Sequence, residues 1–222
     1  MTQELKVLLI IGVITAVAII GAIFFLGKST PSSQNNIGTG TKVPANLLNS
    51  LERADNHKIS TDSAKVTVVE FSDLECPACA TAQPIVKRIL EDERGKINFI
   101  YRHFPLPQHT KALDAIKAAE AAGEQGKFWE MHDKLFATQE AWTDNNDFKN
   151  LFVSYAQELG LDTTKFKTDM ESTKYDAKIN EDKNDGFTLG VNSTPTFFIN
   201  DQKYPGILPY DEFKTAIESA GK

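Results

Sequence analysis

The sequence predicts an α/β fold, in which a β-sheet is interrupted by an inserted helical block and preceded by one transmembrane helix. Three observations favour this fold class. A strand, a helix and a second strand follow one another over residues 65–104. Amphipathic helical patterns then fill about 108–187, and two short strands and a helix close the chain over 195–220. Because strand signals flank a long helical stretch, we expect one sheet with a helical insertion.

An uncharged run, Val7–Gly27, lies near the start of the chain. As a helix, its 21 residues would span about 30 Å, the thickness of a bilayer core. The run is longer than the apolar core of a signal peptide, about 7–15 residues, and no small-residue cleavage site follows it. We therefore expect residues 1–27 to be a signal anchor at the cell membrane, with a cytoplasmic N-terminus. The alternative, a cleaved signal peptide, also places the folded domain outside the cytoplasm.

Residues 28–50 are expected to form a flexible linker. Its first part, Lys28–Pro44, is rich in Ser, Thr, Gly, Asn and Pro and offers almost nothing to bury. The remaining residues, 51–222, suffice for one folded domain with a hydrophobic core, in which the helical insertion occupies about 108–187.

The folded domain is predicted to contain a βαβ unit. Lys65–Phe71 (KVTVVEF) is β-branched and mostly apolar, which is typical of a buried strand. Cys76–Arg94 has apolar residues at helical spacing, and Lys96–Phe104 (KINFIYRHF) is predicted to be a second strand. Two strands joined by a helix in this way pair in parallel.

Helices are expected in the insertion, and a strand pair and a helix at the end. The helical segments are Thr110–Gln139 (divided by Gly123 and Gly126), Asp147–Leu159, Thr163–Glu171 with Asp162 at its cap, and Tyr175–Phe187. The final elements are the strand Pro195–Asn200, the edge strand Asp201–Tyr204 and the helix Tyr210–Ala220.

The formal net charge of −6 and the absence of a basic stripe disfavour nucleic-acid binding. Acidic residues gather at Glu181, Asp182 and Asp185, but they form no recognisable calcium-binding loop. We interpret this cluster as a solvated helix face.

The chain contains only two cysteines, Cys76 and Cys79, at the predicted junction of strand and helix. Unpaired backbone N–H groups and the helix dipole favour a thiolate at the helix start, and a thiolate is the form that attacks a disulfide. Pro77 suits the first helical turn because it lacks an N–H group. Cys79, one turn later, would be more buried and could resolve a mixed disulfide. The pair therefore predicts a redox-active disulfide, with no further cofactor.

Two other interpretations of the cysteine pair remain open at this point. The pair could be half of a zinc site, but structural zinc needs four ligands and the four histidines show no paired spacing. It could also be a purely structural disulfide, although closing so short a loop would add little stability. Neither alternative explains the position of the pair as well as redox chemistry does, and we expect no metal.

Two more features lie near this motif. Strand alternation places Glu70 on one face with Val66 and Val68, inside an apolar strand where a carboxylate is costly without a partner or a task. It is interpreted as a proton acceptor near Cys79 with a raised pKa, or alternatively as a solvated, edge-facing glutamate. The segment Ser193–Thr196 opens the last core strand, and a cis bond before its proline is expected.

Four blocks of sequence in order resemble the DsbA-type thiol–disulfide oxidoreductases of the thioredoxin superfamily, especially their membrane-anchored bacterial forms. The blocks are VVEFSDLECPAC, YRHFPLP at Tyr101–Pro107, AAEAAGEQGKFWEMHDKLF at Ala118–Phe136, and GVNSTPTFFIN at Gly190–Asn200. The resemblance covers about Lys65–Ala220 and implies a thioredoxin-like fold with an inserted helical domain.

The resemblance also implies roles for single residues. Cys76 matches the nucleophilic cysteine, Cys79 the resolving cysteine and Glu70 the buried acid. Pro84 matches the proline that kinks the active-site helix.

Further roles concern substrate binding and the tuning of the site. Thr194 and Pro195 match the cis-proline loop that binds extended substrate. In the motif Cys76-Pro77-Ala78-Cys79, Ala78 stands where strongly oxidising members often have histidine, so the oxidising strength is expected to be lower.

The expected function is an extracytoplasmic thiol–disulfide oxidoreductase, as a dithiol oxidase that introduces disulfides into exported proteins. Its partners would be exported proteins with free thiols and a membrane quinone reductase of the DsbB or vitamin-K-epoxide-reductase type. The alternatives are a disulfide reductase or isomerase of the same fold, or a redox-inactive peptide-binding chaperone. The reduction potential distinguishes the first two.

Overall fold

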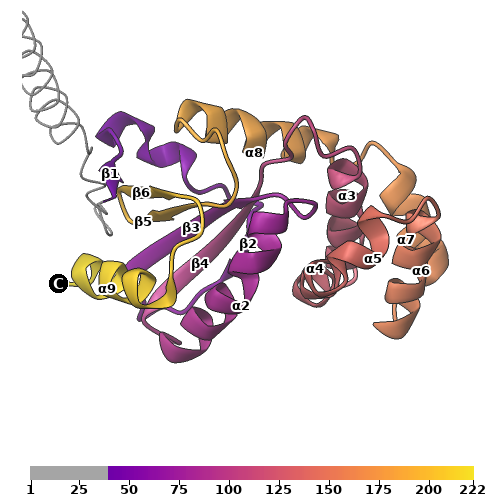
Figure 1. The fold of residues 1–222 in the computed structure, drawn as a ribbon, viewed down its shortest axis with the longest axis horizontal. Helices are drawn as coiled ribbons and strands as arrows, with labels where there is room; N and C mark the ends of the chain where they lie inside the picture. The colour runs from indigo at the N-terminus through magenta and orange to yellow at the C-terminus, as the bar shows by residue number, and fades with distance from the viewer. Residues whose placement is uncertain (1–39) are drawn as a thin grey trace, which may run out of the picture. The chain divides into compact units, whose positions relative to one another are not determined.

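A mixed β-sheet with the strand order β1-β6-β5-β3-β4-β2 forms the centre of the structure, a computed structural model that describes residues 40–222 (Figure 1). The strands are β1 (Thr41–Lys42), β2 (His57–Ile59), β3 (Val66–Ser72), β4 (Ile97–His103), β5 (Thr196–Ile199) and β6 (Gln202–Pro205). Only β3 and β4 run parallel to each other, and the other neighbouring strands of this sheet are antiparallel.

The central βαβ unit has the predicted form. Strands β3 and β4 pair in parallel and are joined by α2 (Pro77–Asp92), so that Glu70 lies opposite Tyr101 and Ser72 lies opposite His103. Both strands are buried over most of their length. This burial explains why their sequences are nearly continuous apolar runs rather than alternating ones.

Helices cover both faces of the sheet (Figure 1). On one face, α2 and α9 (Tyr210–Ala220) pack against a core that includes Val68. On the other face, α8 (Asp176–Thr188) and the 3₁₀ helix η1 (Ala45–Ser50) lie over a core that includes Val69. Neighbouring strand residues thus serve opposite cores, as the two-residue period of a strand requires.

The helical block stands between β4 and α8. It consists of α3 (Ala112–Gly123), α4 (Phe128–Ala137), α5 (Gln139–Thr143), α6 (Phe148–Glu158) and α7 (Thr163–Glu171). The predicted break after Gly123 occurs, and Gly126 has a φ of +75°, which favours glycine. Asp162 caps α7 as predicted, because its side chain accepts hydrogen bonds from the backbone N–H groups of Thr164 and Lys165.

The N-terminal part of the domain differs from the prediction. Residues 41–50, expected within the flexible linker, form β1 and η1. Strand β1 pairs with β6, so β6 is not the edge strand that the sequence suggested. Strand β2, which was not predicted, pairs with β4 at the opposite edge.

The interpretation of the acidic cluster as a solvated face is wrong for two of its residues. Asp182 is fully buried and Asp185 is 7% exposed. Both accept hydrogen bonds from the buried Arg102, at 2.6 Å in each case, and Asp185 also pairs with Arg53. Arg102 further donates to the backbone carbonyl oxygens of residues 50 and 51 at 2.9 and 3.1 Å. The cluster is therefore an internal ion-pair network.

The predicted membrane span, residues 7–27, and the linker up to residue 39 lie outside the described residues. Within residues 40–222, no helix combines the length and the apolar character needed to cross a bilayer.

Candidate active site

The two cysteines lie where the loop after β3 enters α2. Cys76 is the N-cap of α2, with extended backbone (φ −75°, ψ 121°), and Pro77 occupies the first turn. Cys76 is 6% exposed and Cys79, one turn further on, is 1% exposed. An incoming substrate can therefore reach Cys76 more readily, and both residues are free thiols in this structure.

The buried carboxylate of Asp73 holds the loop that presents Cys76. It accepts hydrogen bonds from the backbone N–H groups of Glu75 and Leu106, each at 2.8 Å, and lies 2.7 Å from Nδ1 of His109. The backbone carbonyl of Asp73 accepts a hydrogen bond from the N–H group of Cys76 at 3.0 Å. The loop before α2 is thus tied to the segment after β4.

The pKa values of the two thiols are shifted in opposite directions. The pKa of Cys76 is lowered to about 5, mainly by the hydrogen bond from the side chain of Cys79. Burial opposes this shift, while Thr194 and the backbone N–H groups of Ala78 and Cys79 add to it. Burial, followed by the hydrogen bond to Cys76 and its charge, raises the pKa of Cys79 well above its usual value. At neutral pH the site therefore holds a thiolate at Cys76 and a thiol at Cys79.

The cis-proline loop lies beside Cys76. The Thr194–Pro195 peptide bond is cis, as expected from the sequence. In its thiol form, Cys76 donates a hydrogen bond from Sγ to the carbonyl oxygen of Thr194 at 3.5 Å. The loop leads directly into β5, and the contact of Thr194 with Cys76 places it beside the start of α2.

Glu70 lies in the buried layer beneath the cysteines. It is 1% exposed, so the alternative of a solvated, edge-facing glutamate is wrong. Burial raises the pKa of Glu70 to about 7, and its charge contributes to the raised pKa of Cys79. A carboxyl group with a pKa near neutrality can both accept and donate a proton under physiological conditions.

The remaining predicted residues lie within α2. Ala78 offers its backbone N–H group to Cys76 but no side-chain donor. Pro84 lies inside the helix, which continues to Asp92.

One contact to the active-site loop had no signal in the sequence. Gln139, at the start of α5, donates hydrogen bonds from Nε2 to the carbonyl oxygens of Leu74 and Cys76, at 2.7 and 3.1 Å. Its partners are backbone groups more than sixty residues earlier in the chain, and no pattern of residue types records such a contact. The helical block thereby contacts the cysteine loop directly.

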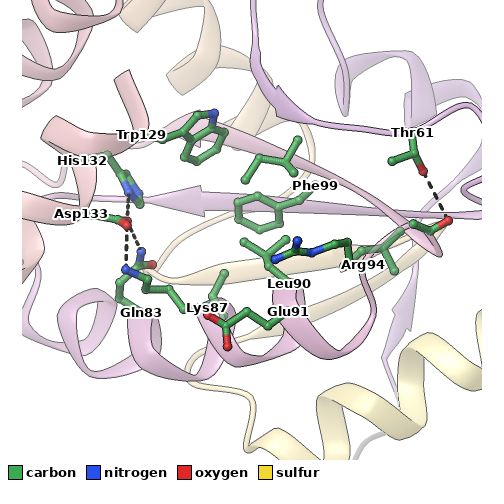
Figure 2. A pocket seen from close by; sticks show the side chains of 14 residues that line it. Thr61, Gln83, Lys87, Leu90, Glu91, Arg94, Phe99, Trp129, His132 and Asp133 are labelled. Atoms are coloured by element: carbon green, nitrogen blue, oxygen red, sulfur yellow. Dashed lines mark hydrogen bonds and ion pairs between the residues drawn. The ribbon is translucent and has the colours of Figure 1, made fainter. Parts of the chain in front are cut away.

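A cavity of about 330 Å³ lies further along α2, between this helix and α4 (Figure 2). Its apolar wall includes Leu90, Phe99 and Trp129, and neither cysteine lines it. At one end, Asp133 accepts hydrogen bonds from Gln83 and Lys87, each at 2.8 Å, which join α2 to α4.

Comparison with known proteins identifies the family of this chain. A family model described as thioredoxin matches residues 53–219. The chain belongs to this thioredoxin family. The family, the fold and the cysteine pair together support an oxidoreductase.

Curated relatives of this thioredoxin-family protein carry the region as part of longer chains. It is 37% identical over 166 residues to a protein named Na⁺/H⁺ antiporter NhaA 1 from Salinispora arenicola, covering 74% of this chain and 24% of that protein. The corresponding protein of Mycolicibacterium gilvum is 32% identical over 174 residues, with shares of 76% and 27%. The chain thus spans about a quarter of the length of the curated relatives it matches.

Several solved structures are similar to this thioredoxin-family protein. A thioredoxin-like oxidoreductase from Silicibacter pomeroyi has a TM-score of 0.66 and 28% identity, over 78% of this chain and 95% of that one. BdbD from Bacillus subtilis has a TM-score of 0.67 and 23% identity, over 83% and 98%. Alpha-DsbA1 from Wolbachia pipientis has a TM-score of 0.70 and 24% identity, over 79% and 94%. The last two show the shared fold.

Proposed function

We propose that the chain is an extracytoplasmic dithiol oxidase that introduces disulfides into exported proteins through Cys76 and Cys79. The observation that carries the proposal is the contrast between the two thiols, with the pKa of Cys76 lowered to about 5 beside a buried Cys79. Stabilising the thiolate stabilises the reduced form, and a stable reduced form makes the disulfide a stronger oxidant.

The pKa shift also fixes how this effect depends on pH. Between about pH 5 and 9, the unfolded chain keeps a proton on Cys76 that the folded, reduced protein has lost. The stability of the reduced protein therefore rises with pH across this window, and the gain is lost as the pH falls through about 5. The disulfide is expected to be most oxidising, relative to an ordinary dithiol, between about pH 7 and 9, because at higher pH the raised pKa of Cys79 acts in the opposite direction.

The proposed partners follow from the function as an oxidase, in which electrons pass from substrate thiols to the disulfide of the protein. Exported proteins with free thiols would donate electrons to the Cys76–Cys79 disulfide, and the cis-proline loop at Thr194 and Pro195 would bind their extended backbone. A membrane quinone reductase of the DsbB or vitamin-K-epoxide-reductase type would reoxidise the pair. No cofactor other than the disulfide takes part in this proposal.

A redox titration against glutathione tests the proposal. We expect a potential less negative than about −270 mV, the value typical of thioredoxin. Ala78→His adds a donor beside Cys76 and should raise the potential by about 30 mV for each unit by which the pKa of Cys76 falls. Glu91→His, at the distant end of α2, is the matched control and should leave the potential unchanged. A wild-type value at or below that of thioredoxin would favour the reductase or isomerase instead.

The location of the protein is part of the same proposal. The uncharged run Val7–Gly27 would keep the chain in the membrane as a signal anchor, with the thioredoxin-like domain outside the cytoplasm. Full-length protein is expected in the membrane fraction, with its domain accessible to protease added to intact spheroplasts. A mature N-terminus between residues 27 and 44 would contradict the retained anchor.

A further inference from the structure

A hollow of about 670 Å³ lies beside the first turn of α2, where this helix faces the end of α4 and the start of α5. From α2 it is lined by Pro77, Ala80 and Thr81, which share one side of the helix because they are three and four residues apart. The opposite wall consists of Phe136, Ala137, Thr138, Gln139, Glu140 and Ala141. Since Pro77 follows Cys76 directly, this α2–α5 hollow adjoins the residue that a substrate meets first.

Gln139 brings an unused hydrogen-bond acceptor to the α2–α5 hollow. Gln139 is 8% exposed, and its amide hydrogens donate to the carbonyl oxygens of Leu74 and Cys76, at 2.7 and 3.1 Å. Because both partners are acceptors, the amide nitrogen must face them, and Oε1 is the atom left over. Within residues 40–222 this oxygen accepts no hydrogen bond, and it is not one of the polar atoms closed off from solvent. It therefore remains open to a ligand.

The other polar side chains of the hollow are acceptors as well. The hydroxyl groups of Thr81 and Thr138 donate to the carbonyl oxygens of Pro77 and Lys134, at 3.0 and 2.8 Å, so only their lone pairs remain. Glu140 is exposed, is the one charged residue among those that line the hollow, and forms no ion pair within the described part of the chain. A negative site with acceptors and no free side-chain donor is complementary to a cationic side chain, which carries donors only.

We propose that the α2–α5 hollow is a substrate subsite that binds the basic side chain of a residue next to the reacting cysteine of the substrate. This inference rests on the proposed thiol–disulfide exchange and names the class of thiol on which it acts fastest, cysteines flanked by arginine or lysine. Arginine fits best, because its five N–H donors can serve the carboxylate of Glu140 and Oε1 of Gln139 together. Gln139 also holds the carbonyl oxygen of Cys76, so a side chain bound there lies beside the nucleophile.

The test compares two peptides that differ only at the residues flanking a single cysteine, which are arginine in one and glutamine in the other. Each peptide is mixed in excess with oxidised protein, and acid quench gives the rate at which the Cys76–Cys79 disulfide is reduced. The ratio of the two rates is divided by the ratio measured with 2-hydroxyethyl disulfide, which removes the intrinsic difference between the peptide thiols. For the wild type we expect a normalised preference for arginine of about tenfold, because hydrogen bonds to charged groups contribute on that scale.

Two variants should remove this preference in different ways. Glu140→Lys places a like charge at the binding position and should bring the normalised ratio to about one or below. Ala137→Leu leaves the charge unchanged but fills part of the hollow, and it should reduce the preference at least threefold. Ala137 and Glu140 are both exposed, so the two variants should fold like the wild type.

The matched control is Glu171→Lys, at the end of α7. Glu171 is exposed, forms no ion pair among the described residues and does not line the hollow. The control makes the same change of net charge as Glu140→Lys and should keep the tenfold preference at the same ionic strength. The comparison separates binding in the hollow from the general attraction of a cationic peptide to an acidic protein.

Three results would overturn the subsite. A normalised ratio near one in the wild type would show that the flanking residue is not recognised, as expected if another part of this chain or a second copy fills the hollow. An unchanged preference in Glu140→Lys would place the recognition elsewhere, and an equal loss in Glu171→Lys would assign it to overall charge. Failure of the proposed function would look different, because the wild-type disulfide would then react with neither peptide.

Discussion

Cys79→Ala is expected to accumulate covalent adducts with its substrates through Cys76. The lowered pKa of Cys76, about 5, keeps its sulfur available as a thiolate for attack and for mixed-disulfide formation. The adducts form when the Cys76 thiolate of the variant attacks a substrate disulfide. Their resolution by the protein requires its second thiol, and Cys79 is the only other cysteine in the chain. Removing it should abolish turnover while leaving the first attack intact.

Non-reducing gels of membrane fractions, with mass spectrometry of the adducts, measure this result. Cys76→Ala is the control and should give neither adducts nor turnover, because the raised pKa of Cys79 keeps that buried group protonated. Alkylation of reduced wild-type protein by iodoacetamide should be half-maximal near pH 5 at Cys76. Adducts in Cys76→Ala, or faster alkylation of Cys79, would reverse the assignment of nucleophile and resolving cysteine.

Arg102→Met is expected to lower the free energy of unfolding by about 3–5 kcal/mol, the usual loss when one partner of a buried ion pair is removed. Arg102 is fully buried and supplies hydrogen bonds to Asp182 and Asp185. Without it, Asp182 keeps weaker contacts, to the backbone N–H group of His103 at 3.1 Å and to the side chains of Asn56 and Lys178 at 3.3 Å each. The loss arises because Asp182 and Asp185 both lose their shared buried cation, while Lys178 and Arg53 compensate their charges only in part.

Urea unfolding of the oxidised protein measures this difference. Arg94→Met is the matched control, since Arg94 is exposed and forms no ion pair within residues 40–222. Its substitution should change the free energy of unfolding by less than about 0.5 kcal/mol. Similar small changes in both variants would mean that the network does not contribute to stability.

The central part of the fold could be predicted because its signals are local. The strands around Val68 and Phe99, the helix that starts at Pro77 and the cap at Asp162 each depend on residues within a few positions of one another. The position of the cysteines at a helix start also followed from this local pattern.

The predictions that were wrong or missing concern contacts between distant parts of the chain. Asp182 and Asp185 look solvated because their partner, Arg102, lies about eighty residues earlier, and the pairing alone makes their burial tolerable. The contact of Gln139 with the loop before α2 could not be predicted for the same reason, because its partners are the backbone carbonyl oxygens of Leu74 and Cys76, more than sixty residues earlier in the chain.

The order of strands in the sheet has a consequence for solubility. Strands β1 and β2 are neighbours in the sequence but occupy the two opposite edges of the sheet. An uncovered edge offers unpaired N–H and C=O groups to which another chain can add as a strand. Residues 41–59 therefore cover β6 at one edge of the sheet and β4 at the other. Arg102 holds the middle of this segment through hydrogen bonds to the backbone carbonyl oxygens of residues 50 and 51. If the segment detached, both edges of the sheet would become available for strand pairing with another chain.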